Sequence, residues 1–272
     1  MLSGQLTPGS IFKIVTSAAA IQNIPNLDSR TFHCDGSITV DGNKITCTNG
    51  EKHGTMDFQH ALANSCNVTF AQLAIEMGKD KMTAAANSLG LNETFTIDSL
   101  TAAKCHYDVK DASNNQLGWS GVGQYTDQVS PAYMVRLLGA IANGGAPEEL
   151  RIIKSVSGDL TSPSKFGSAK TGRQLMTADV AQRLKKYMRG NVEISYGDDF
   201  FDGIKEMCAK TGTAELGGTK NNNGWMVGFS ADESTPYAFA VVVENTDTYG
   251  INAAGPIANA LLSAAVSNKD AG

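Results

Sequence analysis

The sequence predicts an α+β fold in which an antiparallel sheet is flanked by helices and accompanied by a helical lobe. Apolar residues at helical spacing dominate about residues 55–150, whereas about residues 190–272 hold three strand-like segments and a helix. Strands that follow one another through short turns pair antiparallel, and amphipathic helices pack on such a sheet. No fixed-period repeat or low-complexity linker divides the chain, so we predict a single domain over residues 1–272.

The composition is that of a globular protein with an ample core, because 42% of the 272 residues are hydrophobic and 18% are charged. A formal net charge of −5 and only 7% aromatic residues argue against nucleic acid as a partner. Apolar runs such as Tyr237–Val243 are far shorter than the roughly 20 residues that span a bilayer. No signal peptide is visible, so we expect any targeting segment to lie outside this chain.

In the N-terminal half, periodicity and capping residues delimit the elements. Asp57 is a suitable helix N-cap and Gly78 a suitable helix stop. Asp41-Gly42 is a turn signal between two strand-like runs. The predicted elements are helices over Ile11–Ile21, Asp57–Met77, Lys79–Leu89 and Pro131–Ile141, and short strands within Thr31–Thr48.

In the C-terminal half, the period changes from helical to alternating. Thr177 is a suitable N-cap and Gly190 a suitable stop for one amphipathic helix. The predicted elements are strand and loop over Pro147–Thr171, a helix over Thr177–Arg189, strands over Ile204–Ala214, Gly224–Ala231 and Pro236–Glu244, and a helix over Pro256–Ala265.

Ser10 and Lys13 form the first pattern that can carry chemistry. A serine hydroxyl is a weak nucleophile until a base takes its proton. Three residues along a helix is one turn on the same face, so Lys13 can reach Ser10. Burial among apolar neighbours lowers the pKa of a lysine and makes its amine a usable base. A helix start also offers free backbone N–H groups to developing negative charge.

Two further patterns supply polar groups, Ser65-Cys66-Asn67 and Lys210-Thr211-Gly212-Thr213. The hydroxyl of Ser65 and the amide of Asn67 could relay a proton and hold a substrate amide. A cation and two hydroxyls on a strand beside a cleft make an edge that binds a carboxylate. Gly212 lets a substrate backbone approach that edge closely.

Each pattern occurs a second time in the chain, so spacing alone is not specific. The duplicates are Ser162-Pro163-Ser164-Lys165, Ser113-Asn114-Asn115 and Lys170-Thr171-Gly172. We assign all three duplicates to solvated loops or turns, because none has the helix or strand context that would align its side chains. Order, spacing and predicted secondary structure agree only for the patterns at Ser10–Lys13, Ser65–Asn67 and Lys210–Thr213.

The five cysteines are at positions that form no CxxC pair, and the four histidines form no HxxxH or HExxH pattern. We therefore predict no metal site and no cofactor. Cys34 and Cys47 flank a turn-rich stretch and either form a disulfide across a hairpin or remain thiols. Cys66 lies between two functional positions, so we predict that it is a small core residue and not a second nucleophile.

In combination, the three patterns resemble the motifs of class B penicillin-binding protein transpeptidase domains, which belong to the superfamily of serine β-lactamases and transpeptidases. Pro8–Ile14 resembles the nucleophile motif, Ala61–Phe70 the second motif and Ala209–Glu215 the third. Gly123-Gln124 and Ile141–Gly145 resemble the stretch between them. The resemblance runs over nearly the whole chain and implies the α+β fold of that superfamily.

The resemblance implies D,D-transpeptidation of peptidoglycan stem peptides that end in D-Ala-D-Ala. Ser10 is implied as the acylated nucleophile and Lys13 as its base. Ser65 and Lys210 are implied to pass a proton to the leaving amine. An amine of a second stem peptide then takes the acyl group, and β-lactam antibiotics acylate Ser10 without easy release.

The binding residues are also implied by the resemblance. Asn67 is implied to bond an amide of the substrate, while Thr211 and Thr213 bind its terminal carboxylate and Gly212 allows close approach. The backbone N–H groups of Ser10 and Thr213 are implied to form the oxyanion hole. No cofactor or metal is implied.

One departure from the family pattern is that only nine residues precede Ser10. The family has sheet strands and a helix there, after a non-catalytic domain and a membrane anchor. We expect those parts to lie outside this chain. The resemblance places the full-length protein at the extracytoplasmic face of the cell membrane, where regions absent here contact a cell-wall synthesis complex.

Three other functions remain open on the sequence. A serine β-lactamase shares the nucleophile, but no ExxLN-type pattern follows the second motif. A D,D-carboxypeptidase would use water as the acceptor. A non-catalytic β-lactam sensor would keep the acylated serine without turnover of peptides.

Overall fold

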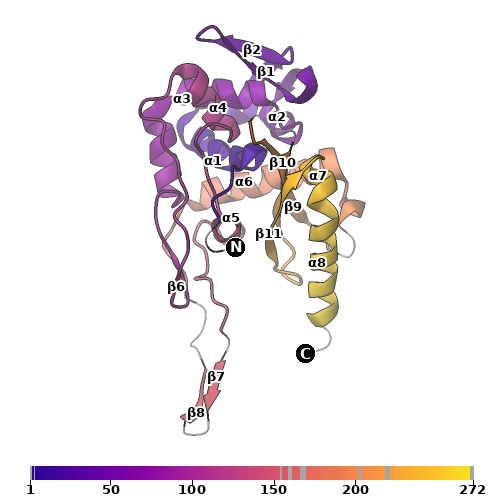
Figure 1. The fold of residues 1–272 in the computed structure, drawn as a ribbon. Helices are drawn as coiled ribbons and strands as arrows, with labels where there is room; N and C mark the ends of the chain where they lie inside the picture. The colour runs from indigo at the N-terminus through magenta and orange to yellow at the C-terminus, as the bar shows by residue number, and fades with distance from the viewer. Residues whose placement is uncertain are drawn as a thin grey trace.

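The computed structural model describes residues 2, 4–153, 155–158, 161–165, 170–201, 204–217 and 221–269, and its ribbon is drawn in Figure 1. Its α-helices are α1 (Lys13–Asn23), α2 (Phe58–Ala63), α3 (Asn67–Ser88), α4 (Asn114–Val122), α5 (Pro131–Ala142), α6 (Ala178–Asn191), α7 (Gly250–Ala253) and α8 (Gly255–Lys269). Its strands are β1 (Thr31–Cys34), β2 (Ser37–Val40), β3 (Asn43–Thr46), β4 (Gly54–Asp57), β5 (Thr96–Ile97), β6 (Leu100–Thr101), β7 (Ser155–Gly158), β8 (Thr161–Lys165), β9 (Met207–Glu215), β10 (Asn222–Ser230) and β11 (Ala238–Thr246). Short helical turns are η1 (Gly9–Phe12), η2 (Leu27–Ser29), η3 (Thr48–Gly50), η4 (Val192–Tyr196) and η5 (Asp198–Phe200).

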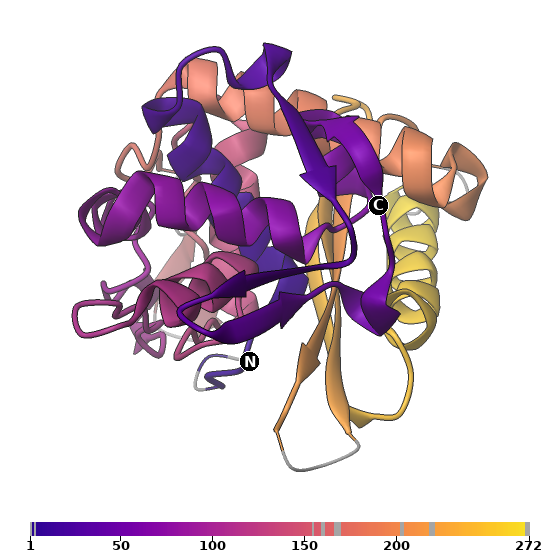
Figure 2. The same cartoon turned by 90° about the horizontal axis from the view of Figure 1, so that it is seen from above.

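The central sheet is antiparallel with the strand order β11-β10-β9, which confirms the predicted meander and the α+β class. Alternate residues of these strands face opposite layers. Trp225 and Val227 join the large core that includes α1, α5 and α6, whereas Met226 packs with Ala258 and Leu262 of α8. Figure 2 shows this sheet between α8 and the helices of the lobe. The sheet thus forms a rigid layer beside α1.

The first helix is buried on every side. Its residues from Lys13 to Ile21 are all buried, and the helix packs on α3, α4 and α6. The short turn η1 precedes it and lies against β9. A helix at the centre of the lobe that begins at the sheet can hold Ser10 and Lys13 firmly, because its surroundings are close-packed.

The helix predicted over Asp57–Met77 is wrong in one important respect. Asp57 does cap a helix, since its side chain accepts a hydrogen bond from the backbone N–H of His60 at 2.8 Å. However, the helix ends at Ala63, and α3 begins anew at Asn67. Ser65 between them has a left-handed backbone with φ of +53°. The apolar period runs through this break, so the sequence pattern concealed it.

Two further boundaries differ from the sequence predictions. The run around Ser113 is not an exposed turn, because Ser113 and Gln116 form a capping box that begins α4. Gly190 does not stop α6, which continues to Asn191 and through a π-helical turn to Tyr196 before Gly197 ends it. A Cβ at Gly190 would lie about 2.5 Å from the side-chain amide of Gln59, so this glycine serves close packing.

The remaining strands form two-stranded ribbons. β2 and β3 pair through the predicted turn at Asp41-Gly42, and β1 pairs with β4. The β7–β8 hairpin extends away from the body (Figure 1). Ser162 of the duplicate SxxK pattern lies on the strand β8, so the loop predicted there is wrong, although no helix aligns Ser162 with Lys165, as predicted. Among the described residues, no helix has the length and apolarity needed to cross a bilayer.

Gly123 fixes the contact between α4 and η1, and its replacement is expected to destabilise the protein. Its φ is +91°, and a Cβ there would lie 2.2 Å from the carbonyl oxygen of Gly9. We expect Gly123→Ala to cost about 2–3 kcal/mol, because strain and steric overlap add. This corresponds to a Tm roughly 5–10 °C lower by calorimetry.

Gly139→Ala is the matched control, because Gly139 lies within α5 and no atom lies within 4 Å of its added Cβ. Alanine is the better helix former by roughly 0.5–1 kcal/mol, so the control should be neutral or stabilising. Equal melting temperatures for Gly123→Ala and the unmodified protein would show that this contact is dispensable.

Candidate active site

Ser10 lies in η1, immediately before α1, and two backbone contacts hold this turn in place. The N–H of Gly9 donates to the carbonyl oxygen of Gly123 at 2.9 Å. The indole N–H of Trp225, on β10, donates to the carbonyl oxygen of Thr7 at 3.0 Å. The turn is therefore tied both to the helical lobe and to the sheet.

Lys13 is completely buried, and its amine makes four short contacts. Nζ lies 2.9 Å from Oγ of Ser10 and 3.0 Å from Oγ of Ser65. It also lies 2.6 Å from the carbonyl oxygen of Ser65 and 2.7 Å from Oδ1 of Asn67. The carbonyl and amide oxygens can only accept hydrogen bonds. A neutral amine would satisfy both with its two N–H groups and keep its lone pair for the Ser10 hydroxyl.

The orientation of Asn67 supports this assignment of donors and acceptors. Its Nδ2 donates to the carbonyl oxygen of Thr46 at 2.8 Å, which directs Oδ1 towards Lys13. Asn67 is the first residue of α3, and its position depends on the break after α2. The Ser65–Asn67 turn therefore faces the nucleophile from across the site.

Two buried lysines share Ser65. Nζ of Lys210 lies 3.1 Å from Oγ of Ser65, opposite the Lys13 contact. Burial lowers the pKa of Lys13 to about 7, although the thiols of Cys66 and Cys47 act in the opposite direction. Burial, together with the charge of Lys13, also holds the pKa of Lys210 well below its ordinary value. Neutral amines are thus accessible in both lysines near neutral pH.

The Lys210–Thr213 segment lies on β9, at the end of the sheet order among the described strands. The N–H of Thr211 donates to the hydroxyl of Tyr196 at 2.9 Å, so it points away from β10. Backbone groups repeat their direction every second residue in a strand, so Thr213 presents its N–H on the same free edge. A Cβ at Gly9 would lie 2.7 Å from the carbonyl oxygen of Thr213, which places that edge against η1.

The two threonines are held differently. Oγ1 of Thr213 accepts a hydrogen bond from the N–H of Gly250 at 3.0 Å, and Thr213 lines the cavity. Oγ1 of Thr211 lies 3.0 Å from the buried hydroxyl of Tyr196. Tyr196 was missed by the sequence analysis, because the helix that carries it was expected to end at Gly190. Gly212 was expected to let a substrate approach closely, but a Cβ there would lie 3.0 Å from Pro8 and Ile11, so its lack of a side chain serves packing within the protein.

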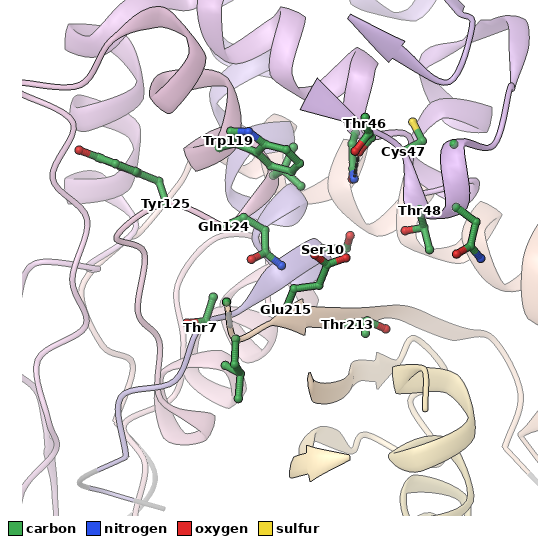
Figure 3. Close-up of a pocket in the computed structure, with 16 residues that line it drawn as sticks. Thr7, Ser10, Thr46, Cys47, Thr48, Trp119, Gln124, Tyr125, Thr213 and Glu215 are labelled. Carbon is green, nitrogen blue, oxygen red and sulfur yellow. Dashed lines mark hydrogen bonds between the residues drawn. The ribbon is translucent and has the colours of Figure 1, made fainter. Parts of the chain in front are cut away.

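A cavity of about 800 Å³ opens in front of Ser10 (Figure 3). Of the residues predicted from the sequence, Ser10, Asn67 and Thr213 line it, whereas Lys13 and Lys210 are fully buried behind this surface. Lining residues that the sequence analysis did not assign to the site include Thr46, Thr48, Trp119, Gln124, Tyr125 and Glu215.

Gln124 lines this cavity and contacts β9. Its side-chain amide accepts a hydrogen bond from the N–H of Glu215 at 3.0 Å and donates to the carbonyl oxygen of Glu215 at 3.3 Å. It thus pairs with the end of β9 as a further strand would. Gly123-Gln124 had been noted in the sequence only as part of a linking stretch. Trp119 was missed because α4 was not predicted.

Acylation of Ser10 is expected to depend on pH through Lys13. The amine accepts a proton only when neutral, and burial lowers the pKa of Lys13 to about 7. The rate of acylation by a penicillin should therefore be constant above about pH 8 and fall about tenfold per unit well below pH 7. Lys210 faces Lys13 across Ser65, and Cys47 and Cys66 are the acidic groups that raise the pKa of Lys13.

Stopped-flow measurement between pH 5 and 9, roughly the range over which the lysine titrates, would test this dependence. The ionic strength should be held constant, because salt screens the neighbouring charges that shift the pKa of Lys13. A rate independent of pH across that interval would rule out the Lys13 amine as the base.

Comparison with known proteins gives one consistent result. A family model described as the penicillin-binding protein transpeptidase domain matches residues 1–263. The peptidoglycan D,D-transpeptidase PbpA of Mycolicibacterium smegmatis is 28% identical over 97% of this chain and 56% of its own length. The chain thus spans about half the length of such curated relatives.

Solved structures show the same likeness. The D,D-transpeptidase domain of a peptidoglycan glycosyltransferase from Eggerthella lenta superposes with a TM-score of 0.88 at 26% identity, over 98% of this chain and 67% of that one. The imipenem acyl-enzyme complex of penicillin-binding protein A from M. tuberculosis gives a TM-score of 0.86 at 27% identity, over 97% of this chain and 61% of that one.

Proposed function

Because this chain belongs to the penicillin-binding protein transpeptidase family, we propose that it is the catalytic part of a serine D,D-transpeptidase that cross-links peptidoglycan stem peptides. The observation that carries the proposal is the Ser10–Lys13–Ser65–Lys210 chain of contacts, with distances of 2.9, 3.0 and 3.1 Å, beside the free edge of β9. It joins a nucleophile, a base and a proton relay in one site.

In the proposed acylation, Lys13 takes the proton of Ser10 as Oγ attacks the carbonyl carbon of the penultimate D-Ala. The N–H groups of Ser10 and Thr213 would stabilise the oxyanion, a contribution of about 3–4 kcal/mol per donor in comparable sites. The peptide C–N bond then breaks. The departing nitrogen of D-Ala receives the proton of Ser65, whose hydroxyl Lys210 holds at 3.1 Å. Ser65 regains a proton from Lys13, which carries the one taken from Ser10, so the amine of Lys13 is neutral again.

In the proposed transfer step, the amine of a second stem peptide attacks the ester carbonyl. It loses a proton to Lys13, which passes the proton to Oγ of Ser10 as that oxygen leaves and the new peptide bond forms. Thr211 and Thr213 would bind the terminal carboxylate of the donor, and Asn67 would bond an amide of the substrate. Gly212 would act through β9, because its lack of a side chain lets this strand pack closely on Pro8 and Ile11. The same geometry would open a β-lactam ring and leave a stable ester on Ser10.

The stem peptide that reaches this site, its acceptor amine and any wider cell-wall synthesis complex belong to the same proposal. The activity of the mycobacterial relative, which is named a peptidoglycan D,D-transpeptidase, supports a peptidoglycan substrate. Such a substrate would be met on the extracytoplasmic face of the membrane, and we propose that location for the whole protein.

The decisive experiment follows a peptide donor ending in D-Ala-D-Ala in the presence of a D-amino acid as acceptor amine. Liquid chromatography with mass detection should show release of D-Ala and an exchanged peptide. A shortened peptide alone would identify a D,D-carboxypeptidase, and no reaction together with a stable penicillin adduct would identify a sensor. A penicillin adduct that clears within seconds would identify a β-lactamase.

A further inference from the structure

Three cysteines and one histidine, side chains that can ligate a metal ion, lie close together beside the Ser65–Asn67 turn. Cys34 ends β1, Cys47 follows β3, His53 precedes β4 and Cys66 is the N-cap of α3. Their three sulfurs and a ring nitrogen of His53 all lie within 4.8 Å of one another. We refer to these four residues as the cysteine–histidine cluster. None of them has a role in the proposed chemistry of Ser10.

Three of the separations within the cluster are close to those of a tetrahedral site. Sγ of Cys47 lies 3.7 Å from Sγ of Cys34 and 3.9 Å from Sγ of Cys66, and Nδ1 of His53 lies 3.4 Å from Sγ of Cys34. Around one zinc ion with Zn–S bonds of about 2.3 Å and Zn–N bonds of about 2.0–2.1 Å, neighbouring sulfurs lie about 3.8 Å apart, and sulfur and nitrogen about 3.6 Å apart. We propose that the cluster binds one structural Zn²⁺ ion.

The surroundings of the cluster support bound thiolates. The N–H of Gly36 lies 3.4 Å from Sγ of Cys34, and both the N–H and the hydroxyl of Thr69 donate to Sγ of Cys66. Such donors stabilise negative sulfur. Nε2 of His53 lies 3.7 Å from a carboxylate oxygen of Glu51. A carboxylate beside the free nitrogen commonly orients a histidine that ligates a metal through the other one.

Burial argues for a structural ion and not a catalytic one. Cys34 and Cys66 have no exposed surface, Cys47 is 4% exposed and the side chain of His53 is 5% exposed. Three thiolates and one imidazole complete the four-coordinate shell and leave no position for water or substrate. Thiolates favour zinc over magnesium or calcium. The three thiol protons would leave to solvent as the metal binds.

The sequence analysis missed this ligand set because its members are far apart in the chain. Twelve residues separate Cys34 from Cys47, five separate Cys47 from His53 and twelve separate His53 from Cys66. The disulfide considered between Cys34 and Cys47 is not formed in this structure, where both are free thiols. A disulfide would need sulfurs about 2.05 Å apart.

A zinc ion in this cluster would also affect the active site, an inference that rests on the proposed function. Cys66 lies between Ser65 and Asn67, and Cys47 directly follows Thr46, whose carbonyl oxygen holds Asn67. A metal bound to both cysteines would fix the Ser65–Asn67 turn against the end of β3. We infer that the zinc ion positions this turn towards Lys13.

The first test is the metal content of the full chain, purified without a chelator or a polyhistidine tag under reducing conditions. Mass spectrometry of the elements should find about one zinc per chain. Cobalt added to stripped protein should produce the intense visible bands and thiolate charge transfer of a tetrahedral site. The proposal is overturned if the protein takes up neither metal under these conditions. It is also overturned if the intact mass shows the loss of two hydrogens that a disulfide between these cysteines would cause.

Single substitutions identify the ligands. Cys34→Ser and His53→Gln should each weaken zinc affinity at least about tenfold in a competition with a chromogenic chelator. Cys105→Ala and Cys208→Ala are matched controls, since both cysteines are buried away from the cluster and should leave affinity unchanged. Equal zinc affinity in His53→Gln and the unmodified chain would remove His53 from the ligand set.

The positioning role is tested separately from metal content. Removal of zinc should slow acylation by a penicillin about tenfold or more, and restored zinc should reverse the loss. If the chain binds zinc but acylates equally fast without it, the positioning role is wrong and the metal site stands. If the chain binds zinc and acylates in neither state, the proposed function fails and the metal site is untouched.

Discussion

Ser10→Ala is expected to abolish the covalent adduct with penicillin and to reduce turnover of a D-Ala-D-Ala peptide by at least about 10³-fold. Among the described residues that line the cavity, Ser10 and Asn67 lie within hydrogen-bond distance of Nζ of Lys13, and of these two only Ser10 carries a nucleophile. Intact-protein mass after reaction with penicillin measures the adduct directly.

Ser162→Ala is the matched control, because Ser162 heads the duplicate SxxK pattern but lies on β8. It should form the adduct at the rate of the unmodified protein. Ser10→Ala should also melt at nearly the same temperature, since its hydroxyl is a small group at a partly exposed position. A full adduct on Ser10→Ala would mean that another residue is acylated, and peptide mapping would locate it.

Lys13→Met is expected to slow acylation by about 10²–10⁴-fold, the usual contribution of a general base. Methionine fills much of the buried space but supplies no lone pair to Ser10. Lys13→Arg separates proton transfer from charge, because a guanidinium stays protonated at neutral pH. It should be nearly as slow as Lys13→Met. Acylation rates with a chromogenic β-lactam provide the measurement.

Lys170→Met, in the duplicate KTG pattern, is the control for loss of a lysine, because Lys170 is exposed. Thermal unfolding of each variant establishes that it folds; Lys13→Met should be no less stable at low pH, since it removes a buried charge. If Lys13→Arg acylated within about threefold of the unmodified rate while Lys13→Met did not, Lys13 would act through its charge and not as a base.

Much of the fold was predictable, because short-range interactions set it. Asp57 and Thr177 cap their helices as predicted, each accepting a hydrogen bond from a backbone N–H three residues later. The turn at Asp41-Gly42 has positive φ at both residues, as a tight hairpin requires. The three C-terminal strands begin and end within a few residues of their predicted limits.

The errors arose where packing overrules local pattern. The apolar period continues across residues 64–66, yet the chain breaks there and Ser65 adopts a left-handed backbone. Gly190 resembles a helix stop, but it is the place where α6 lies against Gln59. The capping box of Ser113 and Gln116 was visible in the sequence and was overlooked in favour of the polar composition around it.

By itself, the sequence determined which residues can do chemistry, because Ser10 and Lys13 are one helical turn apart and the other two motifs have recognisable local contexts. Only the tertiary structure decided which of these side chains come into contact. Ser65 contacts Lys13, 52 positions away in the sequence, and Lys210, 145 positions away. It also gathered Cys34, Cys47, His53 and Cys66. Periodicity and capping act over a few residues, whereas these contacts exist because the sheet, α1 and α3 bury apolar surface against one another.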